Sequence, residues 1–209
     1  GSADLAGSTS VAVPGETFGP TCYGGSSVAF GIREHAMAAF ASGVALHGLW
    51  RPYASTYLAF SDYMRPALRL AALMELPTIM VFTHDSVAVG EDGPTHQPIE
   101  QVASLRTVPG MSVVRPADAA ETRAVWRRVI AEPDGPVSLI LSRQTLPCLP
   151  EAGDAARGGR VVLTHGDGMG VALIATGSEV HVAVEAARAL AAEGHSVRVV
   201  SMPCVEWFE

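Results

Sequence analysis

PTIMVFTHDSVAVGEDGPTHQP, residues 77–98, joins a continuous apolar run to a loop crowded with polar side chains. The run at 77–83 has the length of a strand, and a strand that is apolar throughout is typical of a parallel sheet covered on both faces. The overlapping segment 83–98 holds two histidines, three acids, two glycines and two prolines. Ligands of parallel α/β sheets bind where the strands end. The position of the loop therefore predicts a functional site.

Predicted helices and strands alternate on both sides of this run. Helices are predicted at 26–48, 55–76, 96–108 and 117–133. Strands are predicted at 77–83, 111–116 and 135–143, with a short strand or turn at 49–55. This alternation indicates an α/β fold in which a parallel sheet carries helices on both faces.

The first predicted helix is almost uncharged after His35. Small and apolar residues recur along one of its faces with a helical period, namely Ile32, Ala36, Ala39, Phe40 and Gly43. Helices of this kind are usually buried on both sides, between a sheet and a further layer. We therefore expect burial on both sides of this helix.

A second α/β unit is expected near the end of the sequence. Pro, Gly and charged residues become frequent at 144–160, and the range 148–170 is interpreted as a linker. The GDG at 166–168 is interpreted as a turn within it. Residues 171–209 have the pattern strand, Gly turn, helix, strand, with Gly194 as the expected helix stop. They are interpreted as the start of an incomplete second α/β domain.

Composition excludes several classes of protein. The formal charge of −7, with acids and bases interspersed, disfavours nucleic-acid binding, which requires a concentrated basic face. No apolar run has the length of a membrane span. Three cysteines without CxxC spacing fit a reducing compartment. A soluble cytoplasmic protein with no membrane or nucleic-acid partner is therefore expected.

The polar loop at 83–98 allows three interpretations. His84 and His96 could bind a metal, but they lack the tight spacing of helix-encoded ligands. The loop could be merely solvated around a Gly-Pro turn. It could also form a substrate site, with imidazoles for proton transfer and Asp92 for hydroxyl groups.

Two other features are candidates for ligand binding. Glu34 is a carboxylate at the start of an apolar helix, where it either favours the helix dipole or shares a proton with a ligand nitrogen. Tyr53, Tyr57, Phe60 and Tyr63 have helical spacing, which is more often typical of a core than of a pocket. A flat heteroaromatic ligand would suit the same aromatic set.

Several motifs in one order resemble the pyrimidine-binding domain of the transketolase family, which uses thiamine diphosphate. They are GSADLA, GIREHAM, STYLAFSDY, THDSVAVGEDGPTHQPIEQVASLR, RPAD and LSRQTLP. The resemblance covers residues 1–147, and ATGSEV with VVSMP resembles the beginning of that family's C-terminal domain. The resemblance implies a cytoplasmic homodimeric transferase of the pentose phosphate pathway.

The resemblance also assigns cofactor-binding residues. It implies that Glu34 in GIREH is catalytic and hydrogen-bonds the aminopyrimidine ring of thiamine diphosphate. The aromatic pocket for this ring maps onto Tyr57, Phe60 and Tyr63, although the first position is often Phe in relatives. Asp4 in GSADL matches a position near the cofactor.

The resemblance further implies sugar-phosphate substrates. It assigns Ser8, His84 and Arg143 to the phosphate, Asp92 to a substrate hydroxyl, and His96 to the reacting oxygen as a catalytic residue. A guanidinium fork suits a phosphate dianion, and an imidazole can relay a proton near neutral pH. No metal ligand is assigned within this sequence.

The resemblance leaves the diphosphate-binding half of the site outside this sequence. In the family, an N-terminal GDG-type domain holds the diphosphate and its divalent metal, Mg or Ca, and the pyrimidine domain has a further first strand and helix. Three alternatives follow. The chain is a fragment of a transketolase, one subunit of a split transketolase that needs a diphosphate-domain partner, or a non-catalytic interaction module. Dihydroxyacetone synthase is a further alternative within the family, and GIREHAM with GEDGPTHQP disfavours deoxyxylulose-phosphate synthase.

Overall fold

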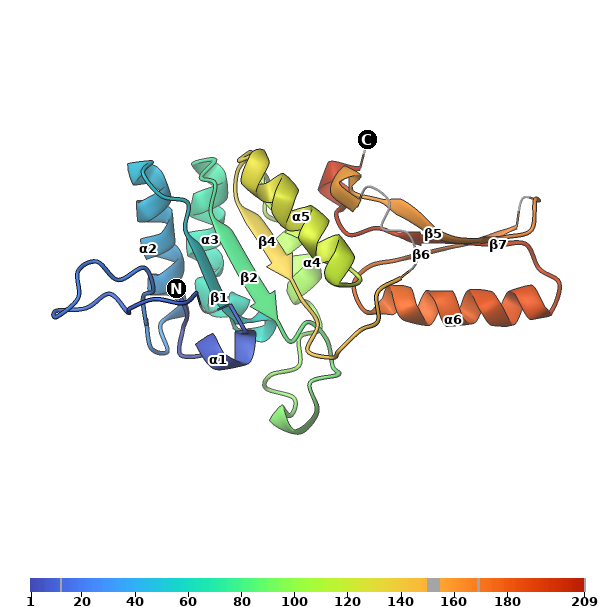
Figure 1. The fold of residues 1–209 in the computed structure, drawn as a ribbon, viewed down its shortest axis with the longest axis horizontal. Helices are drawn as coiled ribbons and strands as arrows, with labels where there is room; N and C mark the ends of the chain where they lie inside the picture. Colours follow the sequence, from blue (N-terminus) through green and yellow to red (C-terminus); the bar gives the residue numbers. More distant parts are fainter. Residues whose placement is uncertain (12, 150–154, 169, 209) are drawn as a thin grey trace. The chain divides into compact units, whose positions relative to one another are not determined.

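The chain forms two compact units (Figure 1). The computed structural model describes residues 1–11, 13–149, 155–168 and 170–208. The first unit comprises Gly1–Ser112 and Pro133–Arg143, and the second comprises Val113–Glu132 and Gln144–Glu209.

A parallel sheet organises the first unit. Its strands β1 (Tyr53–Tyr57), β2 (Ile79–Thr83) and β4 (Val137–Ile140) pair in parallel with β2 in the middle, and the order continues to β3 (Ser112–Val114). Every residue of β2 is buried, which explains its unbroken apolar sequence. The register places Tyr57 beside Thr83, so the carboxyl ends of β1 and β2 lie together. The predicted α/β class and parallel sheet are confirmed.

Helices flank the strands of the first unit. They are α1 (Ala6–Thr9), α2 (Glu34–His47), the 3₁₀ turn η1 (Leu58–Phe60), α3 (Ser61–Leu73), η2 (Gly90–Asp92) and α4 (Gln101–Arg106). Helix α2 packs on α3 and on β1. It ends at Gly48, whose φ of 83° is the left-handed conformation that favours glycine at a helix end. The Arg65 side chain on α3 fixes α4 by donating to the Ser104 carbonyl at 2.7 Å.

Several sequence predictions about these helices differ from the structure. Helix α2 begins at Glu34, so residues 26–33 of the helix predicted at 26–48 are not helical. Residues 55–57 belong to β1 rather than to the helix predicted at 55–76, and α3 begins only at Ser61. Helix α2 is buried on one side only, through Met37, Ala38, Ala41 and Ala45. Its opposite face is exposed in this chain, with Phe40 46% and Leu46 63% accessible.

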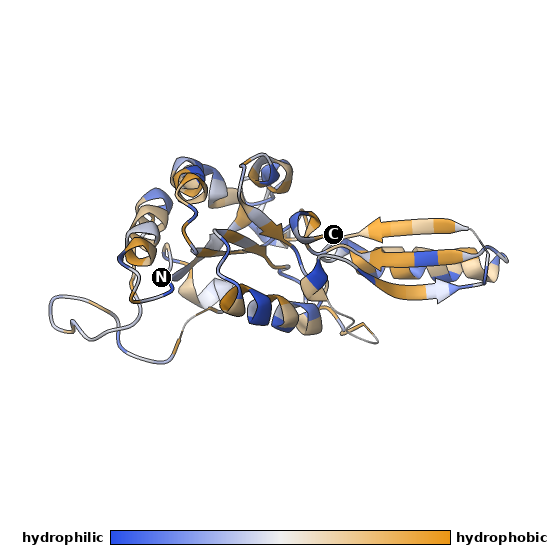
Figure 2. Ribbon diagram, turned by 90° about the horizontal axis from the view of Figure 1, so that it is seen from above, coloured by the Kyte–Doolittle hydropathy of each residue, from blue (hydrophilic) through white to orange (hydrophobic). Residues whose placement is uncertain are grey.

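The second unit contains a smaller mixed sheet. Its elements are α5 (Ala119–Ala131), η3 (Ala155–Arg157), β5 (Arg160–His165), β6 (Val171–Ala175), α6 (Glu179–Ala192), β7 (Val197–Ser201) and η4 (Val205–Trp207). The strand order is β5-β7-β6, with β6 parallel and β5 antiparallel to β7. Helix α6 packs on this sheet through Val184 and Ala187, and apolar residues dominate the three strands (Figure 2). Gly194 follows α6 with a φ of 88°, as expected for a helix stop.

Polar side chains fix helix α5 in the second unit. Asp118 begins α5 by accepting a hydrogen bond from the Glu121 amide at 2.8 Å, which is an N-cap. The buried Glu121 carboxylate forms an ion pair with Arg160 at 2.7 Å and thereby ties α5 to β5.

Strand β5 lies inside the range 148–170, where the sequence indicated only a linker and a turn. Residues 150–154 of that range and Met169 lie outside the described residues. In the described part of the chain, no helix is long and apolar enough to cross a membrane.

Candidate functional site

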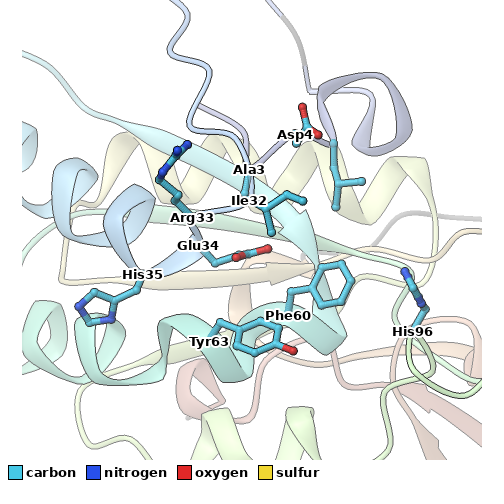
Figure 3. A pocket seen from close by; sticks show the side chains of 10 residues that line it. Ala3, Asp4, Ile32, Arg33, Glu34, His35, Phe60, Tyr63 and His96 are labelled. Atoms are coloured by element: carbon cyan, nitrogen blue, oxygen red, sulfur yellow. The ribbon is translucent and has the colours of Figure 1, made fainter.

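A pocket of about 610 Å³ opens in the first unit (Figure 3). Its walls come from segments far apart in the sequence, and the lining residues are Ala3, Asp4, Leu5, Ile32, Arg33, Glu34, His35, Phe60, Tyr63 and His96. Phe60 follows the carboxyl end of β1, and His96 lies in the polar loop that follows β2. The pocket therefore lies at the edge of the sheet where a ligand is expected.

Glu34 places a nearly buried carboxylate in this pocket. It is the first residue of α2 and its side chain is 6% exposed. The carboxylate points into the space between Ile32 and Phe60, while His35 points away from both (Figure 3). Within the described residues, no group donates a hydrogen bond to it. Its oxygens are therefore available to accept a hydrogen bond from a ligand N–H or from a protonated ring nitrogen.

Aromatic rings form a connected cluster beside Glu34. Tyr57 stacks with Phe60 at a centroid distance of 5.9 Å, and Phe60 contacts Tyr63 at 6.1 Å. These residues lie on β1, η1 and α3, so the single helix face inferred from their spacing is wrong, although the rings do come together. Tyr53 belongs elsewhere, because its hydroxyl donates to the Val11 carbonyl at 2.8 Å. The cluster provides the flat apolar surface that a planar ring requires.

His84 and His96 both join the aromatic cluster. The His84 ring stacks on Tyr57 at a centroid distance of 3.7 Å, and the His96 ring meets Phe60 edge-on at 5.2 Å. Thr83 Oγ1 lies 2.9 Å from His84 Nδ1, and Thr95 Oγ1 lies 2.8 Å from His96 Nδ1. Each imidazole is thus held by its threonine neighbour and by a ring contact, with Nε2 left for other partners.

Burial lowers the pKa of His84 below its usual value of 6.5. Asp92 and Asp85 oppose this effect, whereas Arg143 and His96 reinforce it. His84 is also held at a φ of 59°, a left-handed conformation that is uncommon for residues other than glycine. The imidazole is therefore kept neutral near pH 7 in a strained backbone position.

This pKa shift predicts a loss of stability in mild acid. Below pH 6.5 the unfolded chain binds a proton at His84 more readily than the folded chain does, so the free energy of unfolding falls as the pH falls. His84→Asn should flatten this dependence, since Asn tolerates a positive φ. Urea unfolding between pH 7 and pH 5 tests the expectation. The same slope in both proteins would contradict it.

Asp92 and Arg143 lie near the histidines at the margin of the site. Asp92 ends η2, and Arg143 follows β4, where its guanidinium lies 3.8 Å from the Glu91 carboxylate. Both charges act on His84, which places them within electrostatic reach of its imidazole. Neither residue lines the pocket that contains Glu34.

Of the two candidate residues in the N-terminal segment, only Asp4 lines the pocket. Asp4 lines the pocket and has a φ of 65°. Ser8 lies on α1, is exposed, and is not among the lining residues. The pocket also contains Leu5, Ile32 and Arg33, which the sequence did not single out as ligand contacts. Ile32 and Arg33 precede Glu34 in GIREH, so their position beside it was the available signal.

The loop histidines do not form a metal centre with the acids around them. Among the residues that the structure describes, no group of three or more His, Cys, Asp or Glu side chains could hold a metal ion. His84 and His96 instead contact aromatic rings and threonine hydroxyls.

A lone carboxylate facing aromatic rings, at the carboxyl edge of a parallel sheet, is an arrangement that suits a planar nitrogen-containing ring. Comparison with known proteins agrees with this kind of ligand. Residues 1–148 match the transketolase pyrimidine-binding domain, and residues 158–209 match the transketolase-like C-terminal domain. The chain belongs to the transketolase family.

Individual relatives show how far the similarity extends. The transketolase of Mycobacterium bovis is 53% identical over 228 residues, covering 100% of this chain and 33% of the relative. A transketolase structure from Pichia stipitis, in complex with sedoheptulose 7-phosphate, has a TM-score of 0.94 and 41% identity, covering 99% of this chain and 32% of the other. An inactive β4 tetramer of a split-gene transketolase has a TM-score of 0.74 and 32% identity, covering 86% and 58%. This chain thus spans about a third of the length of the first two relatives.

Proposed function

We propose that this chain supplies the pyrimidine-binding half of a transketolase site. The complete enzyme would transfer a two-carbon ketol unit from a ketose phosphate to an aldose phosphate, in the pentose phosphate pathway of the cytoplasm. The observation that carries the proposal is the Glu34 carboxylate, which faces the pocket without a donor among the described residues. Because the chain spans about a third of its relatives' length, the proposed catalytic unit is this chain together with a diphosphate-binding domain.

The pocket fits the pyrimidine end of thiamine diphosphate. Glu34 would accept a hydrogen bond from the aminopyrimidine ring, and Phe60, Tyr63 and Tyr57 would offer it an aromatic surface. Asp4 would lie beside it. When bound, the cofactor supplies an electron sink for cleavage of the carbon–carbon bond. A divalent metal, Mg or Ca, would be held with the diphosphate by the other domain.

Four polar residues are proposed to handle the sugar phosphate. Arg143 and His84 would bind the phosphate, Asp92 a hydroxyl group, and His96 the reacting oxygen. Arg143 and Asp92 lie within electrostatic reach of His84, and His96 lines the pocket that contains Glu34. His96 can therefore stabilise a developing alkoxide and relay its proton. Ser8 is proposed for the phosphate only through the resemblance of its segment.

The exposed face of α2 supports a requirement for a protein partner. Ala36, Ala39, Phe40, Gly43 and Leu46 are exposed, and no charged residue lies between Ala36 and Leu46. An uncharged helix face of this kind is typical of an interface. We propose that it packs against a second copy or a diphosphate-domain subunit.

A split enzyme is the second candidate for the complete protein. The split-gene transketolase with a TM-score of 0.74 favours it, because this chain covers 58% of that shorter relative. In this arrangement a separate subunit would supply the diphosphate-binding domain. The chain alone would then assemble without transferring ketol units.

Assembly-dependent activity tests the proposal. The isolated chain should show no detectable ketol transfer, since we propose that another domain supplies the diphosphate and metal contacts. The chain joined to, or mixed with, a transketolase diphosphate domain should transfer a two-carbon unit from a ketose phosphate when thiamine diphosphate is added. An assembled protein of the expected mass with no transfer would support a non-catalytic module.

Ala39→Arg should block this assembly, because it places a charge in the centre of the exposed α2 face. Ala189→Arg on α6 is the matched control, since it also changes an exposed helical alanine. Sedimentation of both variants with the partner domain measures the effect. Equal assembly by the two variants would remove the α2 face from the interface.

A further inference from the structure

His84 is held at one ring face, at one ring nitrogen and in its backbone conformation. Its ring face lies against the Tyr57 ring at a centroid distance of 3.7 Å, with an interplanar angle of 23°. Its Nδ1 lies 2.9 Å from Thr83 Oγ1, and its backbone has a φ of 59°. The side chain is only 7% exposed. These contacts leave Nε2 as the ring nitrogen without a partner among the described residues.

The threonine contact favours one ring nitrogen of His84 as the site of the proton. Thr83 is 5% exposed, and within the described residues its hydroxyl proton has no acceptor besides His84 Nδ1. If Nδ1 carried a proton, the buried hydroxyl proton would have no acceptor, which is costly. With the hydroxyl donating to Nδ1, the proton of the neutral imidazole would lie on Nε2, where it is left for a ligand.

The surroundings of His84 keep the ring neutral. Desolvation has the largest effect on its pKa and lowers it. The charged groups that act on the ring are Asp92 and Asp85, which raise the pKa, and Arg143 and His96, which lower it. The groups that touch the ring directly are Tyr57 and Thr83.

We propose that His84 is a neutral Nε2–H donor to an anionic oxygen of the substrate, and that Tyr57 is the positioning residue that holds it in this state. The identity of the anion rests on the proposed function, whereas the contacts of His84 with Tyr57 and Thr83 do not. Arg143 would supply the positive charge, and His84 would supply a directed hydrogen bond. Recognition of the anion by this pair would then not depend on protonating His84.

The Tyr57 ring, rather than its hydroxyl group, has this role. The same ring stacks on Phe60 at 5.9 Å with an interplanar angle of 13°, so His84, Tyr57 and Phe60 form a column of rings. Removing the ring would expose the His84 face to water and weaken desolvation, which is the main cause of its neutral state. Tyr57→Phe keeps the column and serves as the conservative variant.

Long-range ¹H–¹⁵N spectroscopy of the 209-residue chain tests the inference directly. His84→Asn identifies the His84 signals among those of the seven histidines. In the unmodified chain we expect the Nε2–H tautomer at pH 7 and a titration midpoint below 6.5. The Nδ1–H tautomer, or a midpoint at or above 6.5, would overturn the proposal without any variant.

Three variants test which contacts set the titration midpoint and the tautomer of His84. Tyr57→Phe should leave the midpoint in place, whereas Tyr57→Leu should move it towards 6.5. Thr83→Val, which removes the hydroxyl, should give a mixture of both tautomers. An unchanged His84 titration in a folded Tyr57→Leu protein would show that Tyr57 does not position the imidazole.

Kinetic measurements on the assembled enzyme distinguish a failure of this inference from a failure of the proposed function. Tyr57→Leu should raise KM for a ketose phosphate, and KM of the unmodified enzyme should not rise between pH 8 and pH 7 as His84 stays neutral. If no ketol transfer is found while the His84 titration is as expected, the proposed function fails and the positioning stands. If transfer is found but KM follows protonation of His84, the positioning fails alone.

Discussion

Replacing Glu34 by Gln in the assembled enzyme should lower kcat/KM for ketol transfer by about 10²- to 10⁴-fold, the range for a group that positions or transfers a proton. An amide cannot share a proton with a ring nitrogen in the way that a carboxylate can. The side chain keeps its size, so the packing around the start of α2 should be retained. Steady-state assays at saturating thiamine diphosphate measure the effect.

The same substitution should leave the isolated chain at least as stable as before. Glu34 has no hydrogen-bond donor among the described residues, so replacing its carboxylate by an amide removes no contact when no ligand is bound. Urea unfolding of the chain without cofactor measures this effect, with the exposed Glu100→Gln as the matched control. Lost activity together with lost stability would indicate a structural role for Glu34 and would contradict its proposed function.

His96→Ala should lower kcat by about 10²- to 10³-fold, as is typical when one stabilising donor is removed from a developing oxyanion. His96 lines the pocket that contains Glu34, and its ring is held against Phe60. KM should change much less than kcat, because the contact is proposed to strengthen in the transition state.

Arg143→Ala is the matched contrast. Its guanidinium lies outside the Glu34 pocket, near Glu91 and within electrostatic reach of His84. A hydrogen bond to a charged group contributes about 1.5–3 kcal/mol, so KM should rise about 10- to 100-fold while kcat is largely retained. A fall in kcat for Arg143→Ala, with a rise in KM for His96→Ala, would reverse the two assignments.

The sequence predicted the parts of the site that depend on chain order. The apolar run at β2 indicated a buried parallel strand, and the loop after it indicated a site, because loops at this edge bind ligands. Glu34 was visible as an acid at the start of an apolar helix. The sequence did not indicate that the Glu34 side chain points into the pocket, which the structure shows.

The aromatic residues show why spacing alone was insufficient. Tyr53, Tyr57, Phe60 and Tyr63 have helical spacing, yet the first two lie on β1. Four consecutive residues of this strand are buried, so no alternation of polar and apolar side chains marked it as a strand. The contact of Tyr57 with His84 joins residues 27 positions apart by number and has no local signal.

Strand β5 was missed for a different reason. Its sequence RVVLTH lies at an edge of the second sheet and stands between glycines. Its register with β7 also shifts between Val161 and Leu163, which breaks the regular pattern of a strand. The Val-Val-Leu run was the one available signal.

The column of His84, Tyr57 and Phe60 should restrict how mutations can change the substrate of such an enzyme. One ring supports both the proposed phosphate-binding histidine and the proposed cofactor surface, so the two properties share a residue. Substitutions in contact usually have non-additive effects. Laboratory evolution towards non-phosphorylated substrates should therefore show epistasis among positions 57, 60 and 84. Libraries that vary these three positions together should yield active combinations that stepwise selection does not reach.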